Sequence, residues 1–209
     1  MTNYHKFYLL LLLLSFFVAC NQPSQDPKST TVFVYEDKNG LVQTYAKEEI
    51  NYVAQYLPLS SQVLKEVDFN RKDSIAIKKA IEELEGNHYL LLKIRPNRAG
   101  QSLETIYTKK QTTKKWSEVI FELNFQLQKQ FVLWQKTAAK TCQLYHVFPG
   151  IKPADGLQFI LLFSDEEAII NQSFDTDIVL EFKDNHFLNE KIAFTFSKSN
   201  LNRIPKLEL

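Results

Sequence analysis

The sequence predicts an α+β protein that is mainly β: an antiparallel β-sandwich or open barrel with one or two helices, one of them packed on a face. Three observations carry this prediction. Residues 118–128 alternate apolar and polar side chains, as a strand with one solvated face does. Short β-branched and aromatic runs follow at close spacing, with turn residues between them. Residues 71–87 instead repeat apolar side chains at helical spacing.

The segment 31–110 mixes strand and helix patterns. Residues 31–45 predict a hairpin, because two runs rich in β-branched and aromatic residues flank the turn Asn39–Gly40. The next stretch, residues 47–57, fits both a helical period and a strand alternation, and we expect a helix that ends before Pro58.

The helix expected at 71–87 has a capping residue, an apolar stripe and a stop signal. Asp73 or Ser74 can cap its first turn, and Gly86 ends it. Because the stripe covers one side only, this helix should pack across a sheet, and residues 88–94 should form the strand that follows.

The segment 111–209 is expected to be an antiparallel β part, although 31–209 can also be a single domain. Phe121 and Phe125 fall on the apolar side of its first strand, which should face the core. The expected strands are 118–128, 131–135, 141–148, 157–165, 177–183 and 191–197.

Residues 1–19 have the form of an export signal. The apolar run from Phe7 to Val18 is shorter than the roughly 20 residues that a membrane-spanning helix needs. It ends with Ala19 directly before Cys20, an arrangement that resembles the lipobox of bacterial lipoprotein precursors. The resemblance implies cleavage between these two residues, and a lipid on the sulfur of Cys20 that holds the chain at a membrane.

Residues 20–30 are small, polar and proline-containing, and we expect a flexible tether after the lipidated cysteine. In the sorting rule of enteric bacteria, Asp after the lipidated cysteine retains a lipoprotein in the inner membrane. Asn21 stands at that position, so the outer membrane is the expected location in the bacterial cell envelope.

The composition argues against nucleic-acid binding and against an intramolecular disulfide. Without residues 1–19 the chain holds 24 basic and 24 acidic residues, so it lacks the positive charge of a nucleic-acid-binding protein. With Cys20 carrying lipid, Cys142 has no partner for an intramolecular disulfide and is expected to be buried.

No motif for catalysis stands out, and we assign no catalytic residue, metal or cofactor. Cys142 and His146 fall on one face of an expected strand, but a metal site would need two further ligands. A Cys–His nucleophile would need a third group to orient the histidine. His88 and His186 border expected strands and should be half exposed.

Two groups of surface residues are candidate contacts. Lys109, Lys110, Lys114 and Lys115 crowd what should be one hairpin tip, and four cations there could contact an anionic surface. The aromatic residues expected to contact a partner are Tyr107, Trp116 and Trp134.

These features favour a lipid-anchored envelope protein with a non-enzymatic binding or assembly role and another envelope protein as its partner. The alternative is a carrier of an apolar ligand in an open β-clam with a helix across its mouth. An envelope enzyme is the third hypothesis. A filled core with an exposed aromatic patch would favour the binding protein, and a large apolar cavity would favour the carrier.

Overall fold

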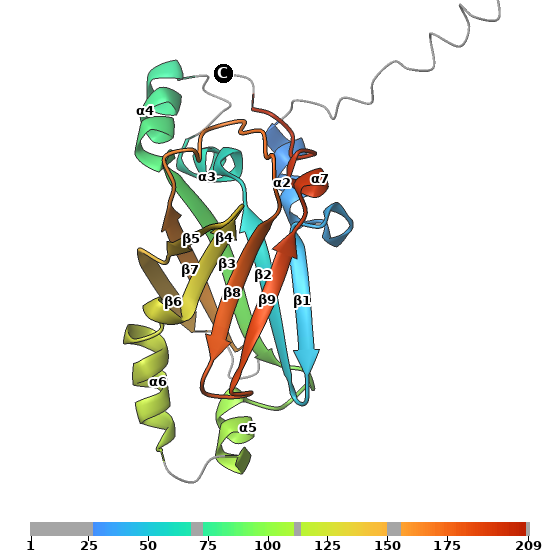
Figure 1. Ribbon diagram of the computed structural model, residues 1–209, viewed down its shortest axis with the longest axis vertical. Helices are drawn as coiled ribbons and strands as arrows, with labels where there is room; N and C mark the ends of the chain where they lie inside the picture. The colour runs from blue at the N-terminus through green and yellow to red at the C-terminus, as the bar shows by residue number, and fades with distance from the viewer. Residues whose placement is uncertain (1–26, 68–72, 111–113, 150–155, 208–209) are drawn as a thin grey trace, which may run out of the picture.

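Two antiparallel sheets face each other across a shared core (Figure 1). The computed structural model describes residues 27–67, 73–110, 114–149 and 156–207. The five-stranded sheet has the order β1 (Val42–Lys47), β2 (Ile50–Leu57), β3 (Asn87–Pro96), β7 (Leu157–Ser164) and β6 (Leu144–Pro149). The four-stranded sheet has the order β5 (Ala138–Thr141), β4 (Phe131–Gln135), β8 (Ile178–Asp184) and β9 (Glu190–Phe196).

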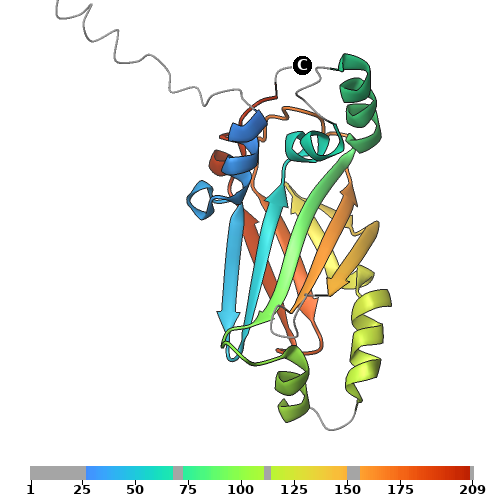
Figure 2. The same ribbon diagram turned by 180° about the vertical axis from the view of Figure 1, so that it is seen from behind.

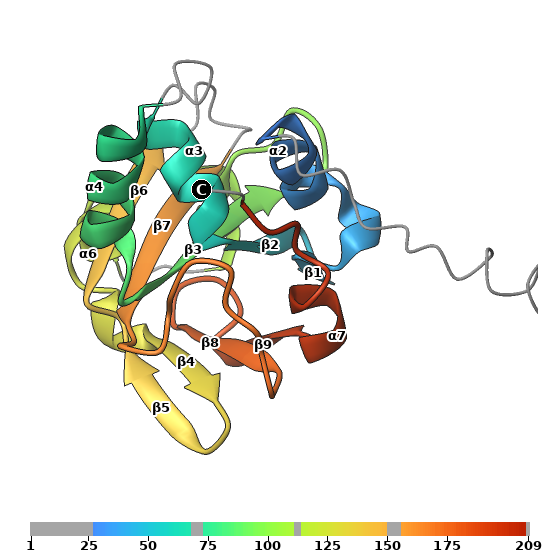
Figure 3. The same ribbon diagram turned by 90° about the horizontal axis from the view of Figure 1, so that it is seen from above.

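The pair of sheets is open, since no ladder of backbone hydrogen bonds joins them among the described strands. They approach each other at both sides, where β1 lies against β9 and β5 against β7 (Figure 3). At the first of these sides, the Tyr45 hydroxyl donates to Glu190 over 2.7 Å, and Lys47 pairs with the same carboxylate. The predicted α+β fold with antiparallel sheets is therefore confirmed.

Helices gather at the two ends of the sheets (Figures 1 and 2). One end carries α2 (Pro27–Tyr35), α3 (Leu59–Glu66), α4 (Ser74–Leu84) and α7 (Lys198–Leu201). The other end carries α5 (Leu103–Lys110) and α6 (Trp116–Phe125). We call them the α2 end and the α6 end. Two short 3-10 helices, η2 (Asp37–Asn39) and η4 (Gln128–Gln130), precede β1 and β4.

Aromatic rings fill the space between the sheets. Phe131 of the four-stranded sheet stacks on Phe182 with ring centroids 5.0 Å apart, and it contacts Phe159 of the opposite sheet at 6.2 Å. The largest side chains that are closed to solvent are Tyr52, Phe131, Phe159, Phe163, Phe182 and Phe196. Both sheets contribute to one core, and the five-stranded sheet takes strands from either side of residue 110.

The expectation of a helix at residues 47–57 is wrong, because this stretch forms β2. A strand forms here because it buries the alternating apolar side chains in the core. Tyr52 lies opposite Ile94 of β3, and Ala54 lies opposite Leu92. A helix would have turned some of these apolar groups to solvent.

The strand expected at residues 118–128 is also wrong, because this stretch forms α6. Val119, Leu123 and Leu127 recur every four residues and are closed to solvent, which is the period of a helix. Ile120, the one residue that breaks the alternation, is half buried against the core. Phe121 and Phe125 consequently point outward instead of into the core.

Three further segments differ from expectation. Residues 31–35 belong to α2 rather than to a hairpin strand, and the chain around the four lysines forms α5 and the start of α6 rather than a hairpin tip. The expected strand 141–148 is divided at Cys142 and Gln143, where the chain leaves the four-stranded sheet and enters the other.

The helix predicted at 71–87 is confirmed as α4. The Asp73 carboxylate accepts the N–H groups of Ile75 and Ala76 at 3.0 Å each, and Gly86 follows the helix with φ of 78°. Its apolar stripe packs on α3 and Leu207 rather than directly on a sheet, so α3 is the helix that contacts β3.

Candidate functional site

Large apolar side chains are exposed on α6 and on the neighbouring strand β6. Phe121 and Phe125 of α6 are 54% and 71% exposed, and their ring centroids are 5.1 Å apart. On β6, Leu144 is 61% and Phe148 47% exposed, and the ring of His146 lies 4.3 Å from that of Phe148. We call these five residues the α6/β6 surface.

Contacts at the end of α6 fix this helix against β6. The backbone N–H of Leu127 donates to the Tyr145 hydroxyl over 3.1 Å. The Gln128 amide donates to the carbonyls of Cys142 and Gln143 over 2.9 and 2.7 Å. The two halves of the α6/β6 surface are therefore presented by elements that are tied together.

Strand β6 ends the five-stranded sheet and pairs only with β7 among the described strands. Leu144 lies opposite Leu162, and His146 lies opposite Ile160, so the exposed side chains of β6 share the outer face of the sheet. An edge strand with exposed apolar groups offers both a surface and unpaired backbone groups to a partner.

Three of the four lysines predicted to meet an anionic surface are paired with carboxylates. Lys109 lies 3.6 Å from Glu49, Lys110 pairs with Glu48, and Lys114 lies 2.7 Å from Glu122. Lys115 is exposed at the start of α6 and has no ion-pair partner within the described ranges. The charge that these residues present to a surface is thus smaller than the sequence suggests.

The aromatic residues predicted to contact a partner have different environments. Tyr107 is buried, and it packs on Trp116 and on Phe187 with centroids 5.8 and 6.4 Å away, so the expectation that it is exposed is wrong. Trp116 is half buried in the same cluster. Trp134 is 36% exposed on β4, away from the α6/β6 surface.

Cys20, the predicted lipidation site, lies outside the described residues, as do the predicted signal peptide and most of the predicted tether. Among the helices that the structure describes, none is both long enough and apolar enough to cross a bilayer.

A buried polar cluster links the two sheets near the α2 end. The His88 Nε2 atom lies 2.8 Å from the Asp165 carboxylate, and His88 Nδ1 lies 3.0 Å from the Tyr56 hydroxyl. Lys140 of β5 lies 2.8 Å from the second oxygen of Asp165. The prediction that His88 is half exposed is wrong, because its side chain is closed to solvent.

The charges of this cluster follow from its contacts. Burial opposes the charge of Asp165, but hydrogen bonds from Lys140 and His88 outweigh it and hold the pKa of this carboxyl below its usual range. Burial lowers the pKa of His88, so its imidazole is neutral at pH 7. The Nε2–H then donates to Asp165, and Nδ1 accepts from Tyr56. Because each of these groups is satisfied and nearly enclosed, the cluster joins the sheets rather than presenting a reactive atom.

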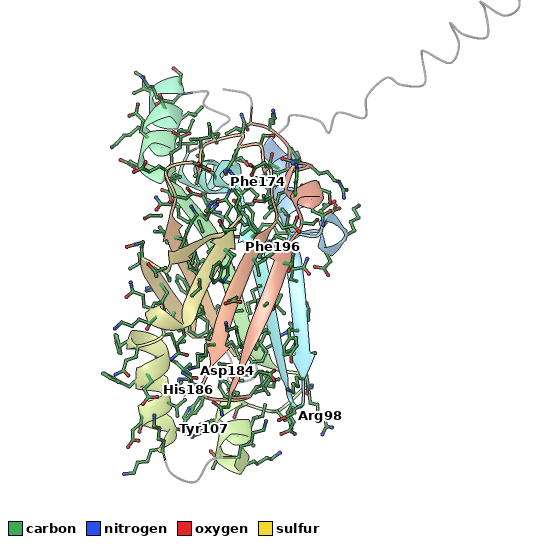
Figure 4. The ribbon with its side chains drawn as sticks, in the orientation of Figure 1. Arg98, Tyr107, Phe174, Asp184, His186 and Phe196 are labelled. Atoms are coloured by element: carbon green, nitrogen blue, oxygen red, sulfur yellow. The ribbon has the colours of Figure 1, made fainter. Side chains whose placement is uncertain are left out.

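A second buried carboxylate organises the α6 end. Asp184 accepts the Tyr52 hydroxyl over 2.5 Å and the backbone N–H groups of residues 186–188 over 2.8 to 3.1 Å. His186 is buried beside it, contrary to the half exposure expected, and burial lowers the pKa of its imidazole. Figure 4 places both residues at this end, with Tyr107 nearby.

The predicted burial of Cys142 is confirmed, and burial raises the pKa of its thiol to about 11. His146 does not share a strand face with Cys142, because Cys142 precedes β6 and lies in the core. In the described part of the chain, no group of three His, Cys, Asp or Glu side chains is arranged to hold a metal ion.

No protein-family model matches the chain, and no curated protein matches it. A crystal structure from Burkholderia pseudomallei K96243, described as a novel protein of unknown function, has a similar course of the chain. The two chains are 9% identical, and the match covers 87% of this chain and 91% of the other with a TM-score of 0.38. A likeness of this degree does not bear on function.

The main features of both regions differ from the sequence-based expectations, although the sequence contains signals for them. His88 stands two residues before Leu90 and shares its face of β3, so the alternation alone places the imidazole inside. Phe121 and Phe125 are four residues apart, which puts them side by side on a helix but not on the buried side of α6.

Proposed function

We propose that this chain is a lipid-anchored protein of the bacterial cell envelope that binds another envelope protein through the α6/β6 surface. Cys20 carries the lipid in this proposal, and the outer membrane is the expected location. The role is recognition or assembly rather than catalysis. The observation that carries the proposal is the contrast between a filled interior and a cluster of exposed aromatic side chains.

The exposed groups are unusual for a protein without a partner. Single exposed apolar residues are common, but four large ones on two elements that contact each other are typical of protein interfaces. Phe121, Phe125 and Phe148 are rigid aromatic side chains, a type enriched where partners bind.

The position of this patch favours a protein over the anchoring membrane. The described chain starts with α2, and α6 lies at the opposite end (Figures 1 and 2). Six residues lie between Cys20 and Pro27, and this stretch of chain spans at most about 25 Å when it is fully extended. Strand β3 alone, with ten residues, extends about 33 Å between the ends. A lipid on Cys20 therefore keeps the α2 end near the bilayer, and α6 lies at the end that is farther from the anchor.

The alternative of an apolar-ligand carrier gains no support from the interior. A carrier needs space between its sheets, whereas Phe131, Phe159 and Phe182 occupy that space with rings in contact. The paired carboxylates beside Lys109, Lys110 and Lys114 likewise weaken attraction to an anionic surface.

Site-specific photocrosslinking tests the proposal. A benzophenone amino acid replaces Phe121, Phe125 or Phe148 in the full chain, and Tyr35 and Ile75 serve as matched controls because they are similarly exposed but lie at the α2 end. We expect the three test positions to crosslink the same envelope protein in living cells and the control positions not to do so. Crosslinking only to lipid, no crosslink at all, or equal crosslinking from the controls would contradict the proposal.

A further inference from the structure

A second feature, independent of the α6/β6 surface, is a cavity of about 170 Å³ at the α2 end. Its walls come from three places: the start of α3, the loop 168–174 and the C-terminal segment 201–206. Figure 3 looks onto this end of the molecule, and Figure 4 places Phe174, one of the wall residues, there. Tyr56, held between Phe174 and Phe196, lines the cavity from the side of the sheet.

The start of α3 has backbone donors without acceptors. Pro58 occupies the N-cap position and supplies no side-chain cap. The N–H groups of Ser61 and Gln62 donate to the Pro58 carbonyl, but those of Leu59 and Ser60 have no acceptor among the described residues. Leu59 and Ser60 both line the cavity. Unpaired N–H groups at a helix start favour an anion, because the helix dipole adds to their partial charge.

Ser60 provides an independent observation. Its side chain is 4% exposed, and its hydroxyl is buried without a hydrogen-bond partner in the part of the chain that the structure describes. Burying a hydroxyl without a partner costs about 1–3 kcal/mol. Ser60 lines the cavity, so an acceptor bound beside it would give this hydroxyl the partner that it lacks.

The charge and polarity of the walls narrow the ligand class. Among the described residues that line the cavity, Lys206 is the only charged one, and none carries a carboxylate. Phe174, Leu201 and Ile204 give the walls an apolar part. The cavity thus combines one cation and unpaired donors with an apolar region, which suits a small anion with a short hydrocarbon body.

Two asparagines hold the cavity walls in place. Asn171 donates to the carbonyl of Leu207 over 2.9 Å and accepts its N–H over 2.7 Å. Asn202 forms the same double contact with the backbone of Phe174, with both distances 2.8 Å. Because the C-terminal segment is fastened to the loop at both points, the cavity is preformed, which lowers the entropic cost of binding.

We infer that this cavity binds a small organic carboxylate. The carboxylate would accept hydrogen bonds from the N–H groups of Leu59 and Ser60 and from the Ser60 hydroxyl. Lys206 would contribute its charge at the rim, and the short apolar body would lie against Phe174 and its neighbours.

The test is a nuclear magnetic resonance titration of the full chain in a non-ionic detergent with sodium butyrate as the probe. Titration to about 20 mM would nearly saturate a site with a Kd of about 1 mM. We expect the amide resonances of Leu59 and Ser60 to shift together with saturation, and butyramide, which has the same shape without the charge, to leave them in place. No shift of these amides with butyrate, or an equal shift with butyramide, overturns the inference.

Variants separate binding from folding. Ser60→Ala removes the unpaired hydroxyl, so it should raise the melting temperature of the free protein while weakening butyrate binding at least about fivefold. Lys206→Gln should weaken binding about twofold to threefold, whereas Lys129→Gln, at an exposed site in η4, should leave it unchanged. Wild-type affinity in the Ser60→Ala protein, or an equal loss in the Lys129→Gln protein, overturns the inference.

Discussion

Replacing Phe121 and Leu123 by alanine, one at a time, tests the orientation of α6 on which the α6/β6 surface depends. Leu123 is closed to solvent, and a buried leucine truncated to alanine costs about 2–5 kcal/mol of unfolding free energy. Phe121 is a little under half buried, about 90 Å² of a side chain that buries about 200 Å² in full, which corresponds to at most about 2 kcal/mol. The retained methyl group and the better helix propensity of alanine reduce this cost to about 1 kcal/mol.

The assay is urea unfolding of each full-length variant, followed by circular dichroism and by the fluorescence of Trp116 and Trp134. The Leu123→Ala protein should lose at least about 2 kcal/mol, and the Phe121→Ala protein about 1 kcal/mol or less. The Phe121→Ala protein should nevertheless lose partner crosslinking from a benzophenone at position 125, because its ring belongs to the contact surface. A loss of 3 kcal/mol or more for Phe121→Ala would mean that its ring faces the core and that this account of the surface is wrong.

Four other predictions concern the core and the polar cluster. Asp165→Asn should lower stability by about 3 kcal/mol in urea unfolding, because it breaks a nearly buried ion pair; a loss below about 1 kcal/mol would argue against a role in joining the sheets. Stability should also fall as the pH drops below about 6.5, since the pKa of His88 is lowered in the fold and the unfolded chain takes up the proton more readily. His88→Gln should flatten that slope, and an unchanged slope would assign it to other groups. The Cys142 thiol, with its pKa raised to about 11, should react with a disulfide reagent at pH 8 only after unfolding, and rapid reaction of the native protein would contradict its burial. Gly156→Ala should destabilise the fold, because φ is +76° and the new Cβ would lie 2.0 Å from the Ile94 carbonyl; a midpoint unchanged in urea would contradict that close approach.

In residues 111–209, the sequence patterns predicted strands correctly where turn residues lie on both sides of the strand. Strands β4, β7, β8 and β9 lie where the alternation placed them, and the two-sided apolar β7 has a strand on each side. The incorrect predictions concern stretches whose apolar residues fit both the period of a strand and the period of a helix. In α6 the apolar residues alternate, yet Val119, Leu123 and Leu127 also meet the helical period, and only contacts with the rest of the chain decide between them.

The candidate sites were harder to predict because they depend on distant parts of the chain. The carboxylates that pair with Lys109 and Lys110 belong to the turn before β2, some sixty residues earlier. The cavity beside Ser60 is lined by the loop 168–174 and by the C-terminal segment, which lie more than a hundred residues later in the chain. No residue spacing in the sequence predicts these ion pairs or this cavity.

Mass spectrometry of the protein purified from its native membranes directly tests the proposal that a lipid on Cys20 holds this β-rich body at the envelope. We expect a chain that begins at Cys20, with a diacylglyceryl group on its sulfur and, in the usual case, a fatty acid on its amino group. An unmodified thiol at Cys20, with residues 1–19 retained or removed at another position, would contradict it.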